Sequence, residues 1–309
     1  MKVYAGYIER TETLFHSASG GLATALSEAV IDKGGIVAGV AYSADFHSAE
    51  YILVDKKEEL TRLQGSKYME VVRGSIYQDV KKLVEAGRLV LFIGLPCSVA
   101  AMEKVMGKPS DRLITCALIC HGPTKAQVHT QYVEKLEQDY QSPLTQFSVR
   151  YKKTGWCVDS YLHAEFQNGK VFEAPFYDTA YGYAFRTMGL PGCYDCKFKG
   201  GQGDLMLGDF WSATPQDDFW NPNGVSVVFA QTEKGQELLS KTPGIRLFPS
   251  SFTRAVEQNP MIVKSRASAP NRTRFEALFA KYGLFTAVFR SHSLKHRVKV
   301  RVLKILGKA

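Results

Sequence analysis

The chain has 309 residues and a formal net charge of +9; 45% of its residues are hydrophobic and 22% are charged. This composition is typical of a globular enzyme of one large or two moderate domains, and it excludes a low-complexity or disordered chain. Six cysteines are too few for a disulfide scaffold. The first residues lack the apolar core of a signal peptide, and no apolar run approaches the roughly 20 residues of a membrane span. We therefore expect a cytoplasmic protein with reduced thiols.

Residues 1–143 alternate apolar strands with amphipathic helices, a pattern typical of an α/β fold. The strands are expected at 2–8, 36–42, 51–54, 89–94 and 113–119. The helices are expected at 19–33, 58–63, 76–86, 98–105 and 124–138. In such a fold, ligands gather at the carboxyl ends of the strands. This region is therefore the expected binding region.

Ser19, Gly20 and Gly21 open the first long helix, with Ser19 as the expected N-cap. The glycines would let an anion approach the backbone, and the helix N-terminus supplies free N–H groups, so the segment suits phosphate binding. Lys67 and Tyr68 lie in a polar loop that could hold a phosphate and a ring. An ordinary capped helix and an ordinary surface loop are the alternatives.

Four cysteines are the candidate ligands of a metal centre. Cys97 and Cys120 each follow an apolar run, and Cys193 and Cys196 have C-x-x-C spacing. Three loops at strand ends could thus close one four-thiolate site, which suits zinc or an iron–sulfur cluster. A dithiol redox pair formed by Cys193 and Cys196 alone is the alternative.

Other reactive residues receive more modest interpretations. Cys116 and Cys157 are interpreted as small core thiols. His121, beside Cys120, is the candidate proton donor, with a hydrogen bond to a carbonyl as the alternative. Asp209 is interpreted as a structural anchor of the cysteine loop. The motifs of serine hydrolases, zinc proteases, P-loop enzymes and dinucleotide-binding folds are missing, so these activities have no support.

Residues 144–285 read as a second, smaller, strand-rich region. The expected strands are 147–151, 158–166, 170–174, 204–209 and 225–231, and the expected helices are 177–188, 234–239 and 273–282. Asn168-Gly169 predicts a hairpin turn. Residues 286–309 form a basic amphipathic tail, which is either a solvated helix or a peripheral contact with an anionic membrane or a partner. No nucleic-acid partner is expected.

The motifs in this order resemble the coenzyme F420 hydrogenase/dehydrogenase beta-subunit family, from about residue 4 to about residue 280. The matching motifs are Ser19-Gly20-Gly21, Gly65-Ser66-Lys67-Tyr68, Gly94-Leu95-Pro96-Cys97, Cys120-His121-Gly122, Cys193-x-x-Cys196 with Phe198, and Gly208-Asp209-Phe210-Trp211. The resemblance implies a flavoenzyme module that binds FAD and a [4Fe–4S] cluster. Such a module passes electrons between a reduced donor, the flavin and a partner or substrate.

The resemblance also implies a role for individual residues. The ligands of the [4Fe–4S] cluster would be Cys97, Cys120, Cys193 and Cys196. The residues near FAD would be Ser19, Gly20, Gly21 and Thr24 at the diphosphate, with Lys67 and Tyr68 as further contacts. His121 remains the candidate catalytic residue.

The family also suggests partners. Longer members begin with a two-cluster ferredoxin segment, but no cysteine precedes Cys97 here. A separate ferredoxin or another redox subunit is therefore an expected partner, beside an unknown small-molecule substrate. Coenzyme F420 is an expected co-substrate, although no motif identifies its site. Some relatives occur in polysaccharide gene sets, which suggests a role in polysaccharide biosynthesis.

We therefore predict an α/β protein, a mixed sheet flanked by helices with a smaller strand-rich second half, acting as an FAD and iron–sulfur oxidoreductase or electron-transfer subunit. The rival is a non-catalytic scaffold or binding protein with a four-cysteine zinc site. In a scaffold, a bulky residue at Gly21 should leave folding and metal content intact. A dithiol reductase would instead tolerate Cys97→Ser and Cys120→Ser.

Overall fold

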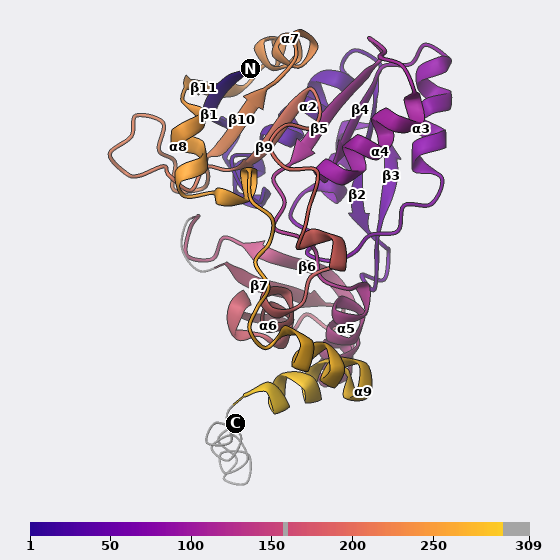
Figure 1. Ribbon diagram of the computed structural model, residues 1–309, viewed down its shortest axis with the longest axis vertical. Coiled ribbons are helices and arrows are strands. Elements are labelled where there is room, and N and C mark those ends of the chain that lie inside the picture. The colour runs from indigo at the N-terminus through magenta and orange to yellow at the C-terminus, as the bar shows by residue number, and fades with distance from the viewer. Residues whose placement is uncertain (157–159, 293–309) are drawn as a thin grey trace.

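The computed structural model describes residues 1–156 and 160–292 (Figure 1). The predicted fold class is confirmed: a large mixed sheet is flanked by helices, and a small antiparallel sheet lies below it. Cys157 and most of the predicted basic tail, 293–309, lie outside the described residues. Within the described ranges, no helix combines the length and apolar character needed to cross a membrane.

The large sheet contains eight strands in the order β11-β1-β10-β9-β5-β4-β2-β3. Their bounds are β1 Lys2–Ile8, β2 Ile36–Tyr42, β3 Ala49–Val54, β4 Val90–Gly94, β5 Leu113–Leu118, β9 Leu205–Asp209, β10 Ser226–Ala230 and β11 Ile245–Pro249. Strands β2, β4, β5 and β9 are parallel, and the outer strands pair antiparallel. Because β4, β5 and β9 run the same way, the residues that follow them meet at one edge of the sheet.

Helices cover both faces of the large sheet. On one face lie α2 (Leu22–Ile31) and α7 (Glu233–Lys241); on the other lie α3 (Ile76–Glu85) and α4 (Pro96–Met106). Alternate residues of β4 pack on opposite sides, with Phe92 towards α3 and α4, and Leu91 towards α2. Both faces are therefore apolar, which explains the unbroken apolar run that predicted this strand. Cys116 is fully buried on the α2 side, which confirms its interpretation as a core thiol.

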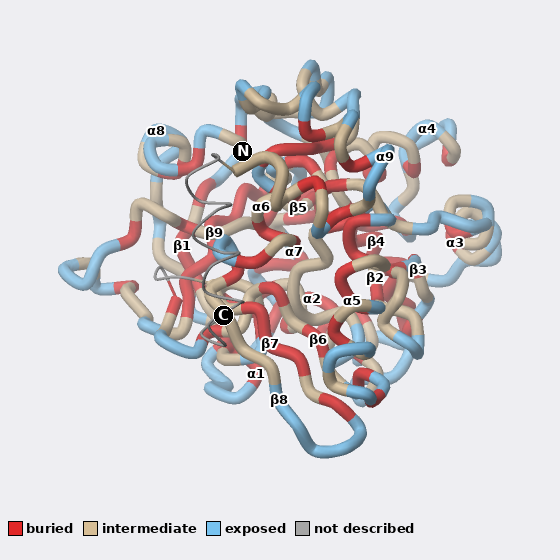
Figure 2. Tube along the Cα trace, turned by 90° about the horizontal axis from the view of Figure 1, so that it is seen from below, coloured by how far each residue is buried: buried red, intermediate tan, exposed pale blue. Residues whose placement is uncertain are grey.

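The small sheet consists of β6 (Leu144–Tyr151), β7 (Tyr161–Phe166) and β8 (Val171–Pro175). The elements packed around it are α5 Ala126–Tyr140, α6 Ala180–Thr187 and α9 Arg272–Ser291. Their shared core is aromatic, with Phe176, Tyr181 and Phe275 fully buried. The predicted Asn-Gly hairpin between β7 and β8 is confirmed, and Gly169 adopts the positive φ of 78° that its turn requires. Figure 2 shows that the buried residues lie mainly in the strands and that the exposed residues lie mainly in the peripheral loops.

The chain returns to the large sheet after building the small one. Strands β9, β10 and β11, all from the predicted region 144–285, pair with β5, with β1 and with one another. The large sheet therefore contains strands from both sides of the predicted division at residue 143. Strand β11 and two short helices, α1 (Thr11–His16) and α8 (Phe252–Glu257), were not predicted from the sequence.

Candidate functional site

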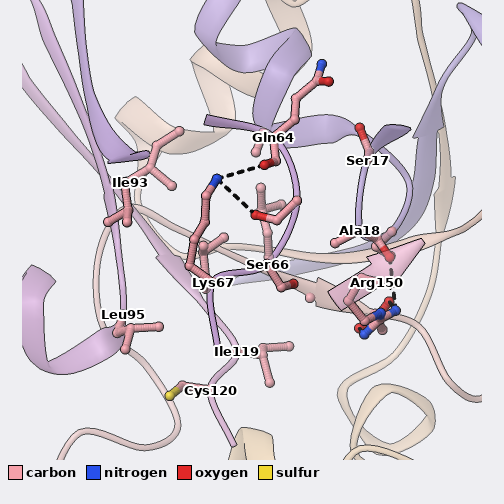
Figure 3. Close-up of a pocket in the computed structure, with 18 of the residues that line it drawn as sticks. Ser17, Ala18, Gln64, Ser66, Lys67, Ile93, Leu95, Ile119, Cys120 and Arg150 are labelled. Carbon is pink, nitrogen blue, oxygen red and sulfur yellow. Dashed lines mark hydrogen bonds and ion pairs between the residues drawn. The ribbon is translucent and has the colours of Figure 1, made fainter. Parts of the chain in front are cut away.

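A cavity of about 330 Å³ opens where β4, β5 and β9 end, between the two sheets (Figure 3). Four segments supply most of its wall: residues 17–24, 63–69, 118–123 and 207–211. The candidate site residues that line it are Ser19, Gly21, Thr24, Lys67, Tyr68, His121 and Cys120; Gly20 lies behind the wall. The fold thus brings together residues that are far apart in the sequence.

The Ser-Gly-Gly segment is held tightly against the large sheet. Helix α2 begins at Leu22, and its N-cap is Gly21 with φ of 73°. The prediction of Ser19 as N-cap was wrong, because the Ser19 hydroxyl donates a 2.9 Å hydrogen bond to the Val225 carbonyl instead. A Cβ at Gly20 would lie 2.4 Å from a carbonyl oxygen of β1, so only glycine fits there.

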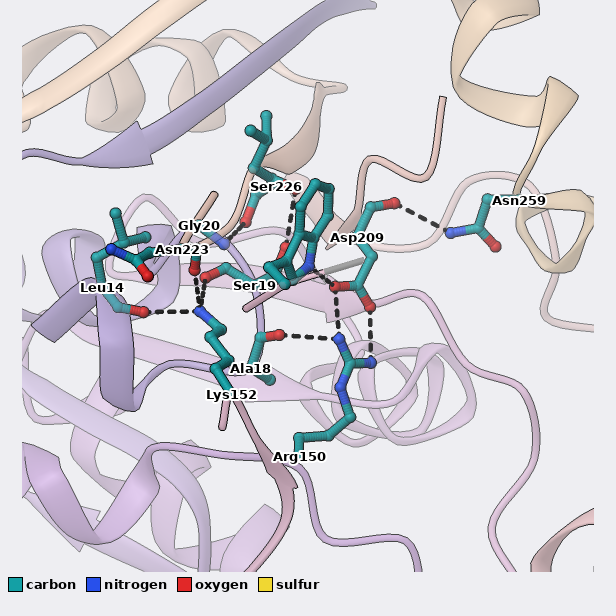
Figure 4. Close-up of polar contacts among 12 residues, drawn as sticks. Leu14, Ala18, Ser19, Gly20, Arg150, Lys152, Asp209, Asn223, Ser226 and Asn259 are labelled. Carbon is teal, nitrogen blue, oxygen red and sulfur yellow. Dashed lines mark hydrogen bonds and ion pairs between the residues drawn. The ribbon is translucent and has the colours of Figure 1, made fainter. Parts of the chain in front are cut away.

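Lys152 anchors the same segment from the side (Figure 4). It is buried, and its Nζ donates hydrogen bonds to the carbonyls of Leu14, Ser19 and Asn223. Burial lowers the pKa of Lys152 to about 7. The Thr24 N–H already donates to the Gly21 carbonyl at 3.1 Å, but the N–H groups of Leu22 and Ala23, the first two residues of α2, have no intrahelical partner. They remain available to an anion, since Lys152 binds the segment through its carbonyl oxygens.

Lys67 presents a second cationic group at the cavity (Figure 3). Its Nζ donates to the carbonyls of Gln64 at 2.7 Å, Arg62 at 3.2 Å and Gly65 at 3.3 Å. No carboxylate of the described chain forms an ion pair with it, and burial lowers its pKa to about 7. The three carbonyls engage all the donors of this amine, so Lys67 would act on an anion in the cavity through its charge, which no carboxylate neutralises.

Arg150 and Asp209 join the cavity walls through what we call the Arg150–Asp209 interlock (Figure 4). The guanidinium makes two hydrogen bonds to the carboxylate, at 3.0 and 3.1 Å, and both side chains are less than one-fifth exposed. Arg150 also donates to the Tyr68 hydroxyl at 3.2 Å and the Ala18 carbonyl at 2.9 Å. Trp156 donates to Asp209 at 2.9 Å. One buried charge pair thus connects the Ser-Gly-Gly segment, the Lys67 loop, β6 and β9.

Asn259 adds a polar side chain to the wall of the cavity. Its Nδ2 donates to the Asp209 carbonyl at 3.2 Å, while its Oδ1 is buried without a hydrogen-bond partner in the described structure. Buried amide oxygens normally accept a hydrogen bond. This unpaired acceptor therefore fits a ligand that carries an N–H or O–H group.

His121 lies at the junction of the cavity and the cysteine loops. Surrounding protein atoms lower its pKa, while Asp209 acts in the opposite direction. Lys199, Arg150 and Arg266 lower the pKa further. Because the pKa of His121 is lowered, its imidazole is neutral at pH 7. A neutral imidazole carries a proton on one nitrogen and can accept a proton on the other.

The four candidate metal ligands lie on three neighbouring segments, here called the cysteine loops: the start of α4 with Cys97, residues 120–122, and residues 191–196. The thiols are free of disulfide bonds. Residues 120–122 touch the 191–196 turn, because a Cβ at Gly122 would lie 3.0 Å from the Cys193 Cβ. The backbone also supports the thiols: the Gly122 N–H donates to Cys120 Sγ at 3.2 Å.

The thiols influence one another electrically. The pKa of Cys120 is raised to about 11, chiefly by burial, and Cys193 and Cys97 contribute in the same direction. Within the described ranges, however, no three His, Cys, Asp or Glu side chains are grouped closely enough to hold a metal ion. The structure therefore places four thiols on adjacent loops without drawing them to coordination distance. A set of four thiols suits zinc or an iron–sulfur cluster.

Several site residues were not predicted from the sequence. The unpredicted residues are Arg150, Lys152, Lys199, Asn259 and Arg266. Each lies in a stretch without a recognisable motif and acquires its partners only through tertiary contacts. Asp209 has a structural role, as predicted, but its partners are Arg150 and Trp156 rather than the cysteine loop.

Comparison with known proteins gives a consistent family. The two matching family models describe the beta subunit of coenzyme F420 hydrogenase/dehydrogenase. The model of its carboxyl-terminal part matches residues 87–243, and the model of its amino-terminal part matches residues 3–75. No curated protein is significantly similar in sequence.

A solved structure shares the fold. It is a chain from the xenon-derivatized F420-reducing [NiFe] hydrogenase complex of Methanosarcina barkeri, with a TM-score of 0.57 and 18% identity. The match covers 91% of this chain and 93% of that chain. At this identity it shows a common architecture over nearly the whole length.

Proposed function

The chain belongs to the coenzyme F420 hydrogenase/dehydrogenase beta-subunit family, and from that premise we propose that it binds FAD in the cavity and a [4Fe–4S] cluster in the cysteine loops. It would then be an oxidoreductase subunit that moves electrons between a reduced donor, a redox partner and a small-molecule substrate. The observation that carries this proposal is a single cavity whose wall contains cationic side chains, aromatic rings and a cysteine.

The cationic part of the wall suits a diphosphate. The N-terminus of α2 offers unpaired N–H groups and the positive end of the helix dipole. Lys67 supplies a positive charge that no carboxylate of the described chain compensates. Ser19, Gly21 and Thr24 line the same cavity, so they would lie against the phosphates.

The aromatic part of the wall suits a flat ring system. Tyr68 stacks on Phe185 with ring centroids 4.4 Å apart, and both residues line the cavity. Asn259 Oδ1 offers an acceptor for a ring N–H. Arg150 fixes the Tyr68 hydroxyl, so the ring wall is set before a ligand enters.

Cys120 belongs to both sites, because it lines the cavity and is one of the candidate cluster ligands. When bound, the flavin would exchange electron pairs with a donor or substrate, and the cluster would carry single electrons. His121 follows Cys120, and its neutral imidazole would hold the proton that accompanies electron transfer. The loop that carries Cys120 and His121 would thus lie between the flavin and the cluster.

Several finer features belong to the same proposal. The electron partner would be a ferredoxin or another redox subunit, and coenzyme F420 would be a co-substrate. A cytoplasmic location and a role in polysaccharide biosynthesis complete it. The support for these features is family membership and the free thiols.

The rival is a scaffold with a zinc site, because four thiols also suit zinc. Substitution of Gly21 no longer separates the two functions. Gly21 has a positive φ of 73°, and a Cβ there would lie 2.6 Å from Ile8 Cγ2, so a bulky residue would disturb the fold in either case. Metal and flavin analysis is the better test.

The test is an absorption spectrum of anaerobically purified protein, with analysis of flavin, iron, sulfide and zinc. We expect flavin bands over a broad iron–sulfur shoulder and about four irons per chain. Colourless protein with one zinc would overturn the redox function in favour of the scaffold. Flavin without iron would retain the cavity assignment and reject the cluster.

A further inference from the structure

We propose that Lys199 and Arg266 are fixed cations that raise the reduction potential of the cluster held by the cysteine loops. Both residues lie outside the predicted ligand set, and both bind the backbone of these loops. The inference rests on the proposed function, because it requires an iron–sulfur cluster at these cysteines.

Lys199 is pinned beside Cys120. Its half-buried Nζ donates one hydrogen bond to the Cys120 carbonyl and another, of 2.9 Å, to the Met261 carbonyl. No carboxylate pairs with it in the parts of the chain that the structure describes. The ammonium charge is therefore held next to a candidate ligand and is not neutralised.

Arg266 occupies a prepared slot on the other side of the same loops. Its NH1 donates to the Gly122 carbonyl at 3.0 Å, and its NH2 donates to the Phe185 carbonyl. Its own backbone N–H donates to the Cys193 carbonyl at 3.3 Å. A Cβ at Gly189 would come within 3.0 Å of the Arg266 side chain, so the glycine keeps the slot open. The guanidinium has no carboxylate partner among the described residues.

A neighbouring lysine shows what an ordinary surface cation looks like here. Lys197 lies two residues before Lys199, but its side chain is 74% exposed and pairs with Asp195 at 2.7 Å. Water and the carboxylate screen its charge. The three cations thus differ in burial and pairing although they occupy the same surface region.

The electrostatic consequence has a definite sign. A cluster held by four thiolates is negatively charged, and adding one electron increases that charge by one unit. A fixed positive charge nearby stabilises the reduced form more than the oxidised form, which raises the potential. The same two cations already oppose the effect of burial on the Cys193 thiol.

Both cations also lie near the cavity. Arg266 binds the Phe185 carbonyl and Lys199 binds the Cys120 carbonyl, and both Phe185 and Cys120 line the cavity. We expect variants of either cation to lower the cluster potential and to change the flavin potential as well.

The experiment compares Lys199→Gln and Arg266→Gln with the matched control Lys197→Gln in anaerobically prepared holoprotein. Iron and flavin per chain are measured first, and the cluster potential is then measured by redox titration followed by electron paramagnetic resonance. We expect the equilibrium constant for reduction to fall about tenfold in each of the first two variants, which is 59 mV for a one-electron couple. Lys197→Gln should change it much less.

Charge-conserving variants keep the test decisive. Lys199→Arg and Arg266→Lys should retain the wild-type cluster potential. If the glutamine variants lose iron, these charge-conserving variants provide the test. A tenfold fall in their equilibrium constant for reduction would overturn the inference. Unchanged potentials in iron-replete glutamine variants, or an equal fall in Lys197→Gln, would also overturn it. Wild-type protein without iron would instead overturn the proposed function on which the inference rests.

Discussion

The cavity and the cysteine loops are neighbours, but their polar groups are satisfied in different ways. In the cavity wall, Arg150 and Asp209 complete each other's hydrogen bonds and join four segments before any ligand is present. In the cysteine loops, the thiols have few partners, and Arg266 joins residues 120–122 to the 191–196 turn only through backbone carbonyls. The first site is preorganised, and the second would be completed by the metal that we propose for it.

The chemistry of the groups explains this difference. A buried guanidinium or carboxylate must be paired, because an isolated buried charge costs several kcal/mol. A thiol avoids this cost by keeping its proton, and burial raises the pKa of Cys120 to about 11. Metal binding would displace the proton and supply the missing attraction between loops. A thiol site can therefore wait for its metal in a way that the Arg150–Asp209 interlock cannot.

The largest effect is expected from removing a cluster ligand. Cys120→Ser should lose most of its iron while the cavity still binds FAD, because the interlock does not depend on the thiols. Iron analysis and flavin fluorescence measure the two sites separately. Cys116→Ala is the control, since that thiol is buried in the core of the large sheet. Retention of iron in Cys120→Ser would contradict the four-cysteine assignment.

Breaking the interlock should have the opposite pattern. Asp209→Asn leaves the Arg150 charge buried without its counter-ion, so the free energy of unfolding should fall by roughly 3–5 kcal/mol. FAD affinity should fall as well, while iron per folded chain stays unchanged. Denaturant unfolding measures the loss. Asp32→Asn, which removes the exposed partner of Lys57, should cost at most about 1 kcal/mol. Equal losses in the two variants would refute the interlock.

The smallest effect should be a pH dependence of FAD binding. Burial lowers the pKa of Lys67 to about 7 in the ligand-free protein. Above that pH the free amine is neutral, and a bound phosphate must draw a proton back onto it. Affinity should therefore weaken as pH rises above 7, by at most about tenfold per pH unit for one proton. Fluorescence titration at several pH values measures this slope.

Lys67→Gln provides the comparison for that slope. The variant should bind FAD more weakly at pH 6.5 and should show a flatter dependence above pH 7. Lys152, with a pKa that burial also lowers to about 7, does not line the cavity. A slope that is the same in Lys67→Gln and the wild type would therefore assign the dependence to another group.

The sequence correctly predicted those strands and turns whose formation depends on neighbouring residues in the chain. The apolar run of β4 indicated a strand buried on both faces, and Asn168-Gly169 indicated the hairpin. The position of Cys97 and Cys120 after such runs correctly placed both at one edge of the sheet. The same reasoning could not find β11, whose apolar and polar residues give only a short, half-exposed edge strand.

Contacts between distant residues explain what the sequence could not reveal. Serine is a residue type that is common at N-caps, but the Ser19 hydroxyl donates a hydrogen bond to the carbonyl of Val225, which is 206 residues away in the chain. Arg150 looks like an ordinary polar residue of a strand, and only the fold places it opposite Asp209. The pairing of two isolated charges across 59 residues leaves no local signal.

The position of β1 has a consequence for the order in which the chain acquires structure. Strand β1 leaves the ribosome long before β10 and β11, the two strands between which it lies. Such distant pairings are slow to form, since a long loop must close first. Until residues 225–249 emerge, the Ser-Gly-Gly segment has β1 beside it but lacks its hydrogen bonds to Val225 and Ser226. The nascent chain must therefore carry β1 unpaired while the residues between are synthesised, exposed to aggregation and to chaperones.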